Sequence, residues 1–75
     1  MKNAGDDMPR SLYNATVIPE IIKMISVKYG LSEDEAITAF YKSETAKALN
    51  DPETGLYGQS ALFIFSLYVE EVRGT

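Results

Sequence analysis

Two clusters of carboxylates are the side chains best suited to acid–base chemistry in this sequence: Glu33, Asp34 and Glu35, and later Glu70 and Glu71. The chain has no His and no Cys, so nucleophilic catalysis by a Ser–His or Cys–His pair is excluded. A catalytic carboxylate also needs a pocket that shifts its pKa, and a chain of 75 residues has little room for one. We interpret the first cluster as a helix start and the second as a solvated helix face, and we predict a protein without enzymatic activity.

Motifs for metal or cofactor binding are also missing from the sequence. Residues 51–55 place two carboxylates before a glycine, but they lack the spaced ligands and the terminal Glu of an EF-hand loop. A zinc site of thiolates or imidazoles is excluded by composition. No phosphate-binding loop of the GxGxxG or GxxxxGK[ST] type occurs. We expect no metal site, no cofactor and no small-molecule substrate.

The charge balance argues against nucleic acids and membranes as partners. Seven Lys and Arg residues stand against eleven Asp and Glu residues, which gives a net charge of −4 at pH 7. A surplus of carboxylates is repelled by phosphate backbones and by anionic lipids. The N-terminal stretch has no signal-peptide pattern, and no apolar run approaches the roughly 18 residues of a transmembrane helix. These features predict a cytoplasmic protein.

The first predicted helix covers residues 16–29, where apolar residues recur along one helical face. We expect Thr16 to be its N-cap, Pro19 to fall in its first turn and Gly30 to end it. The residues before it are polar and show no periodicity. We therefore predict a mobile N-terminal tail over 1–11 and a single helical domain over 12–75.

The clearest helix start in the chain is a capping-box pattern, in which Ser32 and Glu35 satisfy each other's backbone N–H groups. This pattern predicts a helix to about residue 42. A longer helix would carry Glu44 into its apolar face, where an unpaired carboxylate is costly. We therefore expect Ser43 to end this helix and to cap a short one over 44–50. One long helix bent at Ser43 is the alternative.

The last predicted helix starts at Ser60 and runs to about residue 73, after a loop over 50–59 that contains Pro52, Gly55 and Gly58. No segment alternates in the way that favours a β-strand. The sequence thus predicts an all-α fold, a small bundle of three long helices plus one short helix. The expected core is drawn from all four helices: Ile18, Ile21, Ile25, Ile37, Phe40, Leu49, Leu62, Phe65, Tyr68 and Val69.

Two large apolar residues of the last helix, Phe63 and Leu67, lie outside its main apolar arc. Leu56 and Tyr57 precede them in the loop. Exposed aromatic and aliphatic pairs on a helix are typical of partner contacts. We predict that these four residues bind a protein partner or a second copy of the chain. The alternative is that another helix, or the loop residues themselves, cover Phe63 and Leu67.

The tight junction at Ser43 leaves a second functional hypothesis open, a small DNA-binding regulator that resembles a helix-turn-helix protein. A recognition helix needs exposed Arg, Lys, Asn or Gln side chains that reach base edges. The helix over 44–50 offers Lys47 and Asn50 against Glu44. Because this pattern is poor in cations, we favour a non-enzymatic protein-interaction module.

Three strings follow one another in the second half of the chain: Phe-Tyr-Lys-Ser-Glu-Thr at 40–45, Asp-Pro-Glu-Thr-Gly-Leu-Tyr at 51–57, and Gln59-Ser60. In this order they resemble a family of short uncharacterised bacterial helical proteins, a domain of unknown function with an FYxS break and a DPETGLY-type loop. Gly58 and Ala61 depart from the pattern, in which a bulkier residue and a proline are expected. The resemblance implies a helical fold and an accessory or antitoxin-like subunit of a bacterial operon, and it assigns no catalytic residue.

Overall fold

The computed structural model describes residues 10–74, which form four α-helices and one short 3-10 turn, with no strand in that range. The elements in chain order are α2 (Arg10–Tyr29), α3 (Glu33–Lys42), α4 (Glu44–Asn50), η1 (Pro52–Thr54) and α5 (Ala61–Arg73). The all-α prediction is confirmed. The expectation of three long helices is met only in part, because α2 has 20 residues whereas α3 and α5 have 10 and 13.

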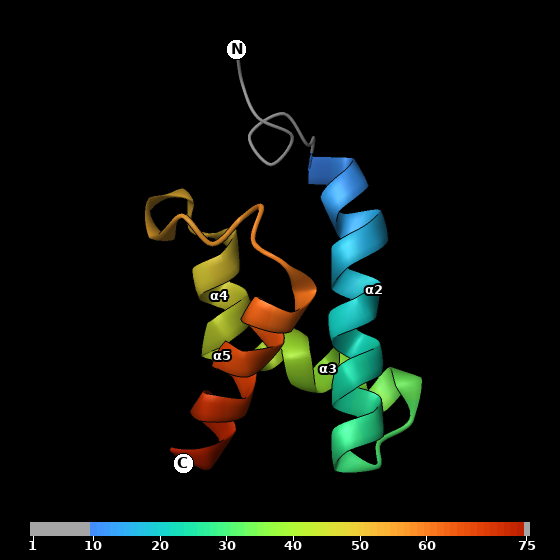
Figure 1. Ribbon diagram of the computed structural model, residues 1–75. Coiled ribbons are helices and arrows are strands. Elements are labelled where there is room, and N and C mark those ends of the chain that lie inside the picture. The colour runs from blue at the N-terminus through green and yellow to red at the C-terminus, as the bar shows by residue number, and fades with distance from the viewer. Residues whose placement is uncertain (1–9, 75) are drawn as a thin grey trace.

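Helix α5 contacts α2 on one side and α4 on the other (Figure 1). Helix α3 crosses behind α2 and α5, and it contacts both α2 and α4. The loop after α4 returns across the top of the view to the start of α5. As a result, α5 has one flank that meets α4 and another that meets α2.

Helix α2 begins six residues earlier than the cap predicted at Thr16. The Thr16 hydroxyl lies inside the helix and donates to the carbonyl oxygen of Leu12 at 2.8 Å, so the predicted N-cap is wrong. Pro19 likewise lies in the helix interior rather than in the first turn. The first turns of α2 are stabilised by Tyr13, which is fully buried. Because residues distant in the sequence bury Tyr13, the periodicity of 16–29 does not predict these turns. Of the predicted tail, residues 1–9 lie outside the described part, and the last two residues belong to α2.

The three predicted serine caps are confirmed. Ser32 and Glu35 form the capping box, with the Glu35 N–H donating to the Ser32 hydroxyl at 3.1 Å. Ser43 ends α3 and accepts from the N–H of Ala46 at 3.0 Å, which starts α4. Ser60 accepts from the N–H of Phe63 at 3.1 Å. Each cap satisfies a backbone donor that a helix start would otherwise leave without a partner.

Most of the predicted core residues are buried. The fully or almost fully buried ones among them are Ile18, Ile21, Ile25, Phe40, Leu49 and Tyr68, and Phe65 packs against them while staying partly exposed. Two predictions are wrong, since Ile37 is 37% exposed and Leu62 is 67% exposed. Val69 is only half-buried.

Helix rotation explains both errors. Helix α3 turns Ala36 and Phe40 inward, and Ile37 then points about 100° away from Ala36. Helix α5 turns Ala61, Ile64 and Tyr68 inward. An apolar arc that covers almost half of a helix can present either edge to the core, so the pattern alone did not fix which edge is buried.

Candidate functional site

An apolar groove between α2 and α5 is the candidate site. Met24 and Val27 from α2 and Phe65 from α5 line it together with Lys23 and Lys28, and its volume is about 370 Å³. Met24 and Phe65 are partly buried and pack against the core, whereas Val27 is 77% exposed. The floor of the groove is therefore continuous with the core, while its edge offers apolar surface to solvent.

The apolar surface continues along the same flank of α5. Leu62, Val69 and Val72 are spaced three or four residues apart with Phe65 among them, so they share one side of the helix. Val72 is 39% exposed and Leu62 is 67% exposed, which within the described residues is second only to Val27 among the large apolar side chains. We name the apolar residues of this surface the α2–α5 face: Met24, Val27, Leu62, Phe65, Val69 and Val72. Exposed apolar side chains gathered on one side of a domain are typical of a surface that contacts another molecule.

The charged residues of α2 beside this face are free of ion pairs. Glu20, Lys23 and Lys28 are all exposed, and the two ion pairs within residues 10–74 join other residues. The Lys28 ammonium lies 5.7 Å from the centre of its neighbour's ring, Tyr29, a contact that leaves it open to solvent. These three charges are available to an incoming partner.

The four partner-binding residues predicted from sequence fall into two groups. Tyr57 stacks on the buried Tyr13, with ring centres 4.3 Å apart, and its hydroxyl donates to Asn14 Oδ1 at 3.1 Å. Leu56 is partly buried against the core. Tyr57 thus attaches the loop to α2, and Leu56 packs the loop against the core.

Phe63 and Leu67 lie on the opposite flank of α5 from the α2–α5 face. Phe63 is 44% exposed and Leu67 is half-buried. They continue at a spacing of four residues to Glu71. Phe63 therefore remains an exposed apolar residue on this flank of α5, outside the groove between α2 and α5.

That polar contact is made by Glu71, which bridges α5 and α4. Its Oε2 accepts from the N–H of Glu44 at 2.9 Å, and its Oε1 accepts from the N–H of Thr45 at 2.9 Å and from the Thr45 hydroxyl at 2.8 Å. Partial burial opposes the charge on Glu71, but these hydrogen bonds outweigh it and lower the pKa of the carboxyl below its usual value. The residue expected on a solvated face is thus a capping carboxylate.

The Glu71 contact also bears on the hypothesis of a recognition helix. Helix α4 holds a carboxylate at its N-terminus, and its Lys47 ammonium is paired with Glu44 at 3.0 Å. A recognition helix approaches base edges with its N-terminal residues. Negative charge at that end opposes the approach of a phosphate backbone.

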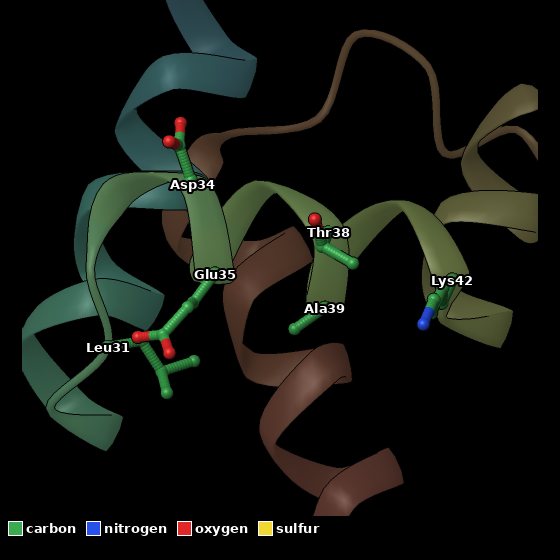
Figure 2. Close-up of a pocket in the computed structure, with 6 residues that line it drawn as sticks. All are labelled: Leu31, Asp34, Glu35, Thr38, Ala39 and Lys42. Atoms are coloured by element: carbon green, nitrogen blue, oxygen red, sulfur yellow. The ribbon is translucent and has the colours of Figure 1, made fainter.

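The carboxylates of the first cluster do not converge on one point. A shallow pocket of about 470 Å³ on α3 is lined by Leu31, Asp34, Glu35, Thr38, Ala39 and Lys42. Figure 2 shows the carboxylates of Asp34 and Glu35 pointing in opposite directions from the helix. One oxygen of Glu35 already accepts the Ser32 N–H at 2.8 Å. This arrangement suits a helix cap and provides no carboxylate pair for acid–base chemistry.

No three acidic side chains within residues 10–74 come close enough together to hold a metal ion. None of the described helices combines the length and the hydrophobicity needed to cross a bilayer.

Sequence reasoning placed Met24 and Phe65 on core-facing arcs and gave Val27 no role. The available signal was the position of Val27, an apolar residue one turn after Lys23 on the side of α2 that also carries Glu20. A single apolar residue on a charged helix face is common. Val27 becomes part of the candidate site because α5 places Phe65 in the same groove.

No protein-family model, curated protein or solved structure matches the chain. The resemblance carried by residues 40–45 and 51–57 therefore stays a hypothesis.

Proposed function

We propose that this domain is a protein-interaction module that binds another chain through the α2–α5 face. The observation that carries the proposal is the open groove at Met24, Val27 and Phe65, with exposed Leu62 on the same flank. Burying apolar area is the main driving force of protein association. A small domain also gains stability from oligomerisation or from a bound partner.

The α2–α5 face contains none of the four partner-binding residues that the sequence analysis predicts. Leu56 and Tyr57 are engaged within the chain, and Phe63 lies on the other flank of α5. As part of the same proposal, the protein is a non-enzymatic accessory or antitoxin-like subunit, or a homo-oligomer, that acts in the cytoplasm. The absence of Cys is compatible with a reducing compartment, and the resemblance described above supports a bacterial operon as its setting.

Site-specific photo-crosslinking in the cells that express the chain tests this proposal. A photoreactive phenylalanine at Val27 probes the α2–α5 face, one at Phe63 probes the other flank, and one at Tyr41, which is 54% exposed on α3, is the control. We expect one discrete adduct from position 27 and none from position 41. Adding Leu62→Ser should abolish the adduct, because it places a hydroxyl in the apolar contact.

Two outcomes would overturn the proposal. If position 27 gives no adduct at any expression level, the α2–α5 face does not meet another chain. If the adduct forms only from position 63, the interaction surface is the one predicted first, at Phe63 and Leu67.

A further inference from the structure

Three charged or polarisable residues on α2 follow one another at a spacing of four residues: Glu20, Met24 and Lys28. In an α-helix this spacing places side chains in one row along the surface. Glu20 and Lys28 lie equally far from Met24, on either side of it. The row therefore has opposite charges at its two ends and a flexible apolar residue at its centre.

Such a row is complementary to itself when reversed. If a second α2 lies antiparallel with its Met24 against the first, Glu20 of each copy faces Lys28 of the other. A parallel arrangement in the same register would instead place like charges together, which is unfavourable. Contacts between identical surfaces about a two-fold axis are the commonest form of oligomer.

From this row we infer that the occupant of the α2–α5 face is a second copy of this chain, docked antiparallel along α2 with Met24 at the two-fold axis. The inference rests on the proposed function, since it names the partner that the face binds.

The surroundings of the row fit this occupant. Glu20 and Lys28 are exposed, and neither belongs to an ion pair within the described part of the chain. Val27, the most exposed large apolar residue of the described range, lines the groove, and the exposed Leu62 lies on the same flank of α5 as the groove residue Phe65. Methionine adapts its shape to an apolar neighbour, which suits a residue that meets its own copy. Lys23 lies on the far side of the row from the core and also lines the groove.

Self-association of the purified protein, measured by sedimentation equilibrium at low salt, gives the first test. We expect a dimer whose dissociation constant rises about tenfold with Glu20→Lys or with Lys28→Glu, because each change turns two attractive contacts into repulsive ones. The double variant, Glu20→Lys with Lys28→Glu, exchanges the charges and should bring the constant back to within about threefold of the original. Lys42→Glu, an exposed change on α3, is the matched control and should leave the constant unchanged.

Disulfide trapping gives a second readout, which is clean because the chain has no Cys of its own. Met24→Cys should form a disulfide-linked dimer under mild oxidation. Val27→Cys should not, because its two copies would lie six residues apart along the helix pair, about 9 Å, beyond the reach of a disulfide.

The outcomes separate this inference from the proposed function. A monomer at all concentrations that still gives a photo-adduct with another protein at Val27 would overturn the second copy and leave the interaction face standing. Failure of the double charge exchange to restore the dimer, or trapping at position 27 instead of 24, would overturn the antiparallel register. A monomer with no adduct would overturn both.

Discussion

The two flanks of α5 differ in how far contacts within the chain cover them. Towards α4, the Glu71 carboxylate uses both of its oxygens to satisfy backbone donors of Glu44 and Thr45. Towards α2, Leu62 is exposed and Phe65 lines an open groove. At its C-terminal end the first flank makes polar contacts inside the chain, which hold the N-terminus of α4. The second flank exposes apolar side chains beside a groove that Lys23 and Lys28 also line.

The largest expected effect separates the buried side of α5 from its open flank. Ile64 is fully buried and Leu62 is 67% exposed, and truncating either to Ala removes the same number of carbon atoms. We expect Ile64→Ala to lower the free energy of unfolding by about 3 kcal/mol, since it leaves a cavity. The matched Leu62→Ala should change it by less than about 0.5 kcal/mol.

Urea unfolding followed by circular dichroism, at a concentration low enough to keep the chain monomeric, compares the two variants. An equal loss from both would mean that Leu62 is covered within the monomer, and the distinction between the buried side and the open flank would disappear. If Ile64→Ala left the free energy of unfolding unchanged, α5 would be rotated so that Ile64 does not face the core described here.

The next largest effect on stability is expected on the flank of α5 that meets α4. Glu71→Gln keeps the shape of the side chain but removes the charge that accepts three hydrogen bonds. We expect a loss of about 1–2 kcal/mol, typical of a helix cap. Glu70→Gln is the control, since Glu70 makes only an exposed pair with Arg73 at 3.3 Å, and it should cost less than about 0.5 kcal/mol.

The loss caused by Glu71→Gln should depend on pH in one direction. The pKa of Glu71 is lower in the folded chain than the ordinary glutamate value of 4.5, so the folded state binds the proton less readily than the unfolded state. The stabilisation is fully present above that ordinary value and is lost as the pH falls through the folded pKa. The difference in unfolding free energy between the parent chain and Glu71→Gln should therefore shrink between pH 6 and pH 3. A constant difference over this range would contradict the capping role.

Sequence reasoning succeeded where the information lies within a few residues. The caps at Ser32, Ser43 and Ser60 depend on donors three residues away, and a capping pattern is visible in any short window. The break before Glu44 was predicted for a similar local reason, the cost of a carboxylate on an apolar face.

The rest of the fold depended on contacts between distant segments. Glu71 meets residues 26 and 27 positions away, so nothing in its own helix marks it as a cap. The α2–α5 face depends on the rotation of α5, which its wide apolar arc leaves open. The early start of α2 depends on the loop that covers Tyr13. The apolar periodicity of the helix does not indicate this contact.

The smallest expected effect comes from the loop that covers Tyr13. This loop leads into α5 and therefore influences how α5 is rotated. The buried Tyr13 hydroxyl donates to the carbonyl oxygen of Gln59 at 2.8 Å, next to Ser60, which starts α5. Burial raises the pKa of Tyr13 above its usual value. We expect Tyr13→Phe to lower the free energy of unfolding by about 1 kcal/mol, the usual value of one hydrogen bond. The start of α5 should also become more mobile.

Tyr57→Phe is the matched control, because it removes the exposed hydrogen bond to Asn14 Oδ1 and keeps the ring stacked on Tyr13. It should cost less than about 0.5 kcal/mol, since water replaces an exposed partner at little cost. Amide hydrogen exchange at the first turn of α5 distinguishes the two variants, with faster exchange expected only for Tyr13→Phe. If both variants exchange like the parent chain, packing of Ala61 and Ile64 alone sets the rotation of α5. The loop would then have no part in deciding which flank stays open.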